Sequence, residues 1–404
     1  MIPHPGHSIT PPAGTAPASP AGLKTLTDFA GALLVAGILL AVLVAYTGDL
    51  FPQIEYRQWI RAEPSSLRSL LAEAFAPVGH FSRAFSYWFV VQTWKVCGGR
   101  VAWANTAQLA LIAFSAGGLF WFLRRVNPSR DGILPAVAIS CCFAFSLPVI
   151  DAASWQATVL DKLAMAFCVA GLHIFMTVGR LQSPRARFWT GNFLSLLIVV
   201  PAYNAKEAAW VLVPIGFLLV VAPPGSAPGT WLKSGAWRDA ALHTALPFAY
   251  AIYHVGMRLR YLAVVNGTDM NHIIGGDIIH NLRNFFLSFF NLGAGTGSAL
   301  TGAFFVILFL FLALAVIAAW KHASSALVLP VLGTMAALAI PASTRYGSLF
   351  YLLVPSLFFW WLVHTSLVEA STLLRGRWRP AVLGAGAVGL AIFRRSIWCR
   401  PAPA

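Results

Sequence analysis

Long apolar runs separated by short polar connections dominate this sequence. The runs recur from about residue 27 to about residue 392, and each has the roughly 17–25 residues that a helix needs to cross about 30 Å of hydrocarbon. Stretches such as 304–319 are almost entirely apolar, whereas the strands of a membrane barrel alternate apolar and polar positions. The pattern therefore predicts an all-α, polytopic bundle of about ten or eleven transmembrane helices.

The limits of the expected spans follow from where each apolar run begins and ends. The expected spans are 27–47, 102–123, 132–150, 156–179, 188–204, 207–222, 241–262, 302–320, 325–342, 348–369 and 380–394. The apolar stretch 85–97 is short for a span, so we expect a helix lying on the membrane surface. The stretch 285–292 follows an amphipathic segment and is expected to be interfacial or re-entrant.

The distribution of basic residues between the spans predicts their orientation. Short loops rich in Lys and Arg alternate with acidic or mixed loops, and cytoplasmic loops are the ones enriched in Lys and Arg. Lys24 precedes the first span, so residues 1–24 are expected to form a cytoplasmic tail. The Pro, Ala and Gly that dominate its first 22 residues predict that this tail is disordered. Residues 25–395 then form the transmembrane domain, with a large outer loop at 48–101, and 396–404 form a second tail. The expected location is the cell (inner) membrane.

Composition changes this picture little. The chain has 404 residues, of which 58% are hydrophobic and 10% are charged, against about 25% charged in a soluble domain. The net charge of +15 comes from short basic clusters between apolar runs and forms no stripe, so the expected partner is the lipid bilayer and not nucleic acid. The ten histidines and five cysteines show no metal-site spacing.

Ionisable residues gather near the expected outer ends of separate spans, where each costs a few kcal/mol if it lies within the hydrocarbon. These residues are Asp49, Glu55, Arg57, Asp151, Asp161, Lys206, Glu207, Arg258 and Arg345. Carboxylates and cations at one membrane depth suit a transfer reaction in which a lipid phosphate is the leaving group. A carboxylate would take the proton of an acceptor hydroxyl, while Arg and Lys would stabilise the charge on phosphate.

A structural interpretation stays open for each of these residues. An arginine near a helix end, such as Arg258, often extends to the headgroups. Asp161 with Lys162 can form a buried structural pair, Asp49 can be a solvated loop residue, and Lys206 with Glu207 can cap a hairpin.

In their order along the chain, these motifs resemble the GT-C glycosyltransferase superfamily, in the layout of protein O-mannosyltransferases and related bacterial membrane proteins. The resemblance covers roughly residues 28–370. In that superfamily a span leads into a large outer first loop that starts with an acidic motif. The matching segments are Asp49 with Glu55, His80-Phe-Ser-Arg83, Phe145–Asp151 followed by Asp161, Asn204-Ala-Lys206-Glu207, and Thr344-Arg345-Tyr346. The family's first motif often has two adjacent acids, whereas Leu50 follows Asp49 here.

The resemblance implies transfer of a sugar from a polyprenyl-phosphate carrier to a glycan, lipid or protein acceptor on the extracytoplasmic face, with inversion. It implies that Asp49 is the general base, with Glu55 as the second candidate. The implied substrate-binding residues are Arg57, Arg83, Asp151, Asp161, Lys206, Glu207, Arg258, Arg345 and Tyr346. Some members use a divalent cation and others do not, so the resemblance leaves this cofactor open.

Two other functions compete with the enzyme. A glycolipid transporter or flippase would need polar groups near the bilayer midplane in two repeat-related positions, and the sequence shows no convincing repeat. A non-catalytic, degenerate relative of the superfamily would agree with the missing second acid at Leu50.

Overall fold

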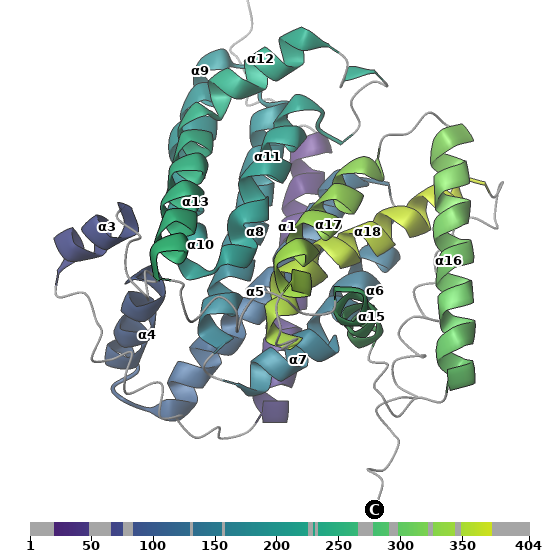
Figure 1. Cartoon of the computed structure of the whole chain (residues 1–404). Coiled ribbons are helices and arrows are strands. Elements are labelled where there is room, and N and C mark those ends of the chain that lie inside the picture. Colours follow the sequence, from purple (N-terminus) through teal and green to yellow (C-terminus); the bar gives the residue numbers. More distant parts are fainter. Residues whose placement is uncertain are drawn as a thin grey trace, which may run out of the picture.

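The computed structural model describes residues 20–47, 66–75, 84–129, 132–155, 158–224, 229–230, 233–265, 278–290, 298–321, 326–343 and 349–373. Every regular element within these ranges is a helix (Figure 1). The predicted all-α fold is therefore confirmed for this part of the chain.

Most of the apolar runs correspond to helices. The elements are α1 (Pro20–Thr47), α3 (Leu67–Phe75), α4 (Ala84–Val96), α5 (Val101–Val126), α6 (Ile133–Ala144), α7 (Leu147–Ser154), α8 (Val159–Arg180), α9 (Pro184–Trp189), η3 (Thr190–Leu194), α10 (Ser195–Ala205), η4 (Glu207–Val211), α11 (Leu212–Val221), α12 (Ser234–His243), α13 (Ala245–Val265), α15 (Ile278–Phe289), α16 (Ser298–Lys321), α17 (Val328–Ser343), η6 (Leu349–Leu352) and α18 (Leu353–Ser371). The expected surface helix 85–97 corresponds to α4, and the expected span 380–394 lies outside the described residues.

Four of the described helices are long and apolar enough to cross a membrane. They are Lys24–Ala45 within α1, and α5, α8 and α18. The pair α6 and α7, bent by 48°, adds a fifth span if it is counted as one. These helices support a multi-pass membrane protein. The count is smaller than the ten or eleven expected, partly because runs such as Glu207–Val221 form apolar helices shorter than the 18 residues required.

The centre of the bundle is built around α8 and α18. In the most apolar 18-residue stretch of each of these helices 83% is buried, whereas in the corresponding stretch of α1 only 17% is buried. α1 therefore lies at the edge, packed along α5. Gly117 of α5 makes this contact close, because a Cβ there would lie 2.5 Å from the carbonyl oxygen of Ala32 and 2.9 Å from Cβ of Ala36.

Paired contacts between α5 and α8 show that the two helices run parallel. Gln108 near the start of α5 meets Lys162 near the start of α8, and Arg125 in the last turn of α5 meets His173 and Thr177. α1 and α10 run in the opposite direction, since Asp28 pairs with Arg124 and Lys206 pairs with Asp161. We call the two ends of this bundle the Asp161 end and the Arg124 end. In the predicted orientation they are the outer and inner ends.

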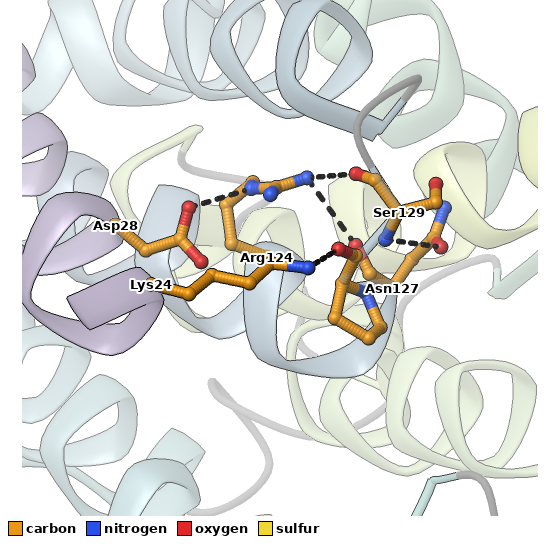
Figure 2. Close-up of polar contacts among 6 residues, drawn as sticks. Lys24, Asp28, Arg124, Asn127 and Ser129 are labelled. Atoms are coloured by element: carbon orange, nitrogen blue, oxygen red, sulfur yellow. Dashed lines mark hydrogen bonds and ion pairs between the residues drawn. The ribbon is translucent and has the colours of Figure 1, made fainter. Parts of the chain in front are cut away.

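At the Arg124 end, a network of polar contacts ties α1 to the last turn of α5 (Figure 2). Nε of Arg124 lies 2.9 Å from Oδ1 of Asp28, and its Nη1 donates to the carbonyls of Ser129 (2.5 Å) and Asn127 (3.5 Å). The ammonium of Lys24 donates to the carbonyl of Pro128. Arg124 lies in the last turn of α5, with its side chain 1% exposed. Its guanidinium can be buried there because backbone carbonyls beyond the helix end accept hydrogen bonds from it.

Candidate functional site

The hairpin between α10 and η4 turns on one extended residue, Lys206. α10 ends at Ala205, Lys206 has φ −159° and ψ 145°, and η4 begins at Glu207. The hydroxyl of Tyr203 donates to the carbonyl of Trp210 (2.9 Å) and closes the turn. Because successive side chains of extended backbone point to opposite sides, Lys206 and Glu207 reach two different helices.

Lys206 reaches toward α8. Its Nζ lies 3.6 Å from Oδ2 of Asp161, and the two side chains are 10% and 5% exposed. The same ammonium lies 4.4 Å from the ring centroid of Tyr351 in η6, within the range of a cation–π interaction. The predicted proximity of Asp161 and Lys206 is therefore found, and Tyr351 adds an aromatic face from a segment far along the chain.

Glu207 reaches toward α13. Nη2 of Arg258 lies 3.1 Å from Oε1 of Glu207, with side chains 9% and 24% exposed. Two carboxylates and two cations from three separate segments of the chain thus lie at the Asp161 end. We call Asp161, Lys206, Glu207 and Arg258 the charged cluster. Its formal charge is zero, which lowers the cost of placing four ionised groups in a largely buried position.

A second buried lysine, Lys162, fixes the start of α8. Its Nζ donates to Oε1 of Gln108 (3.0 Å) and to the carbonyl of Trp155 (3.2 Å). This links α5 and the end of α7 to the helix that carries Asp161. Asp151 lies on α7 with a partly exposed side chain and forms no ion pair with another described residue.

Part of the long loop 48–101 packs against the hairpin through α3. The amide of Asn204 donates to the hydroxyl of Tyr250 (2.7 Å) and to the carbonyl of Ala74 (3.3 Å). The hydroxyls of Tyr250 and Tyr253 donate to the carbonyls of Ala74 (3.1 Å) and Phe75 (2.5 Å). These carbonyls belong to the last turn of α3, where no helical amide is left to bond them. Within this loop, α3 therefore lies beside the hairpin and α13.

The structure describes five of the eleven predicted site residues. Asp161, Lys206, Glu207 and Arg258 come together, and Asp151 stays apart from their ion pairs. The predicted residues Asp49, Glu55, Arg57, Arg83, Arg345 and Tyr346 lie outside the described residues.

Sequence reasoning identified Arg258 but missed the other polar side chains on the same face of α13. Tyr250, His254 and Arg258 follow one another at intervals of four residues, and each faces the α10–η4 hairpin. This spacing puts the three side chains on one side of a helix. It is the sequence pattern from which the polar face could have been predicted. Among the described residues, no group of three or more His, Cys, Asp or Glu is arranged to hold a metal ion.

Comparisons with known proteins add no relative. No protein-family model matches the chain, and no curated protein or solved structure matches it significantly. The chemistry of the site must therefore be argued from its own residues.

Proposed function

We propose that this protein is a membrane glycosyltransferase of the GT-C type, with about ten or eleven spans and a large first outer loop. It would move a sugar from a polyprenyl-phosphate carrier to an acceptor hydroxyl on the extracytoplasmic face of the cell membrane, with its N-terminus in the cytoplasm. The charged cluster is the observation that supports this proposal. It gathers two cations and two carboxylates from α8, the α10–η4 hairpin and α13 at the predicted outer end.

In the proposed reaction, the acceptor oxygen attacks the anomeric carbon of the sugar while the bond from that carbon to the phosphate oxygen breaks. The proton of the acceptor hydroxyl passes to a carboxylate, for which Asp49 is the first candidate and Glu55 the second. The leaving group is the polyprenyl phosphate, which keeps the electron pair of the broken bond. Attack opposite the leaving group inverts the anomeric carbon.

Lys206 and Arg258 would stabilise the charge that grows on the leaving phosphate. Both side chains are about nine-tenths buried, and fixed cations stabilise a developing anion more strongly where water is excluded. Asp161 and Glu207 hold these cations in position before the carrier arrives. Arg258 is suited to phosphate because its planar guanidinium can bond two oxygens.

The two competing functions predict different behaviour. A transporter needs a site that opens to both faces, whereas the charged cluster lies at one end of the parallel helices α5 and α8. A non-catalytic relative would use the two ion pairs only to hold α8, α10 and α13 together. Its activity would be absent, and removal of both members of a pair would have little effect.

The deciding experiment measures sugar transfer in membranes that contain the full chain. Polyprenyl-phosphate hexoses with a labelled sugar are supplied, and the label is followed into lipid-linked and surface glycans. We expect transfer by the natural chain and loss of transfer in the D49N/E55Q variant. Vesicles of purified protein that take up the labelled carrier intact, without transfer, would support the transporter instead. Unchanged glycan labelling in D49N/E55Q would contradict the proposed function.

A further inference from the structure

His254 occupies an unusual environment beside the charged cluster. It is 3% exposed and lies one helical turn before Arg258 on α13. Its ring lies 5.6 Å from that of Tyr203, 5.7 Å from that of Tyr250 and 6.4 Å from that of Trp210, as measured between centroids. Three aromatic side chains from three elements therefore surround one buried imidazole.

The polar atoms around His254 are incompletely bonded. Neither ring nitrogen of His254 has a hydrogen-bond partner among the described residues, and the same is true of Nε1 of Trp210 and Oδ1 of Asn204. Buried polar atoms without a partner are rare, and each calls for an explanation. Asn204 is joined to this group through its 2.7 Å bond to Tyr250. Four such atoms thus come from neighbouring side chains of α10, η4 and α13.

The chemistry of these atoms points to a ligand with several hydroxyls. A neutral imidazole offers one donor and one acceptor, the indole offers a donor, and the amide oxygen is an acceptor. An apolar chain would leave all four unbonded, and a bare phosphate would find no use for the acceptors. A sugar hydroxyl is both donor and acceptor, and the C–H face of a sugar ring packs well on aromatic rings.

We propose that His254, with Trp210 and Asn204, recognises the sugar ring of the lipid-linked donor. This rests on the proposed function and names the sugar-binding part of that site. His254 and Arg258 share one face of α13 a single turn apart, as a sugar and its phosphate are adjacent in the donor. In this arrangement Arg258 exchanges Glu207 for the phosphate, and the sugar ring binds beside the imidazole of His254.

The test compares two ligands bound to the full chain in nanodiscs. One is a short polyprenyl phosphate carrying a hexose, and the other is the same polyprenyl phosphate without sugar. In the natural chain the sugar strengthens binding. We expect His254→Phe to weaken binding of the glycosylated carrier by about tenfold or more, as for loss of one or two hydrogen bonds. Binding of the bare carrier should change by less than about twofold.

A matched control is His364→Phe. His364 is 1% exposed and its ring nitrogens also lack a hydrogen-bond partner among the described residues. It lies one turn after Trp361, which packs on Phe122 toward the Arg124 end. We expect this variant to keep the natural preference for the glycosylated carrier. His254→Asn, which retains a donor and an acceptor, should restore part of the preference.

The possible failures can be told apart. If the natural chain binds neither ligand, the proposed function itself fails and this inference with it. If the natural chain prefers the glycosylated carrier and His254→Phe keeps that preference, only the inference is overturned. If His254→Phe does not fold, Trp210→Phe removes the indole donor and must show the same selective loss. A loss of affinity for both ligands alike in Trp210→Phe would also overturn the inference.

Discussion

The Asp161 end and the Arg124 end of the bundle bury the same kinds of side chain in different ways. Arg124 has a carboxylate at 2.9 Å and two backbone carbonyls within reach of one guanidinium nitrogen. At the Asp161 end, the ammonium of Lys206 lies 3.6 Å from a carboxylate oxygen and over the face of Tyr351. The ring nitrogens of His254 on α13 have no hydrogen-bond partner among the described residues. The first arrangement is typical of a structural clamp, and the second leaves polar groups to which a ligand could bond.

Burial alone does not separate the two ends. His254 and His364 are both buried, and neither has a hydrogen bond to a described residue. The two histidines differ in their neighbours, because aromatic rings from two other elements, α10 and η4, lie around His254. A candidate site is therefore better recognised from converging groups of separate helices than from any single buried residue.

The largest effect is expected from the acidic motif of the first loop. The D49N/E55Q variant removes both candidate bases, so sugar transfer should fall by about three orders of magnitude or more. We expect the yield and the thermal unfolding of D49N/E55Q to stay close to those of the natural chain. The measurement is labelled-sugar transfer per folded protein. Residual transfer near the natural level would remove these acids from the mechanism.

A single substitution at the Arg124 end should act on stability instead. Arg124→Met leaves the carboxylate of Asp28 without its ion pair, which is expected to lower the free energy of unfolding by about 3–5 kcal/mol. The D28N/R124M variant removes both charges and should recover most of that loss. Thermal unfolding in detergent measures both variants. If Arg124→Met left stability intact but abolished transfer, the distinction between the two ends would be wrong.

The matching double variant at the Asp161 end should separate activity from stability. D161N/K206M removes both charges of the Asp161–Lys206 pair together, so its stability should stay within about 2 kcal/mol of the natural chain. Sugar transfer should fall by about 100-fold, because one of the cations on the phosphate is lost. D28N/R124M is the control and should retain transfer. Equal activity of the two double variants would favour a purely structural cluster.

The smallest effect is expected at Tyr351. Replacing it with Leu removes the ring that lies 4.4 Å from the Lys206 ammonium, an interaction worth about 0.5–2 kcal/mol. We expect a several-fold rise in KM for the glycosylated carrier in Tyr351→Leu, whereas Tyr351→Phe keeps the ring and should behave normally. A similar KM in all three proteins would show that the ring does not position the lysine.

Hydropathy predicted the positions of helices better than their lengths. The spans expected at 102–123 and 156–179 correspond to α5 and α8, because a largely apolar run has no alternative to a helix in lipid. It could not show that the π-helical segment η3 interrupts the helix before α10, or that the extended Lys206 separates α10 from η4. It also could not show that Arg124 is buried, since that depends on Asp28, which is 96 residues earlier.

For the candidate site, charge position within spans was the informative signal. Asp161 stood out because it lies inside an apolar run, and the structure pairs it with Lys206. The pairing of Glu207 with Arg258 follows from the extended backbone at Lys206, which no sequence pattern indicated. His254 was not predicted, because the sequence does not distinguish a binding histidine in an apolar helix from a structural one.

The extended conformation of Lys206 has a consequence for how this protein can change over time. Because this one residue is extended, Lys206 contacts α8 and the next residue, Glu207, contacts α13. Substituting side chains near Lys206 would change the affinity for the carrier gradually. Inserting or deleting one amino acid would turn the lysine and the glutamate away from both partners together. Natural variants of this chain should therefore differ in residue type near position 206 much more freely than in the length of that hairpin.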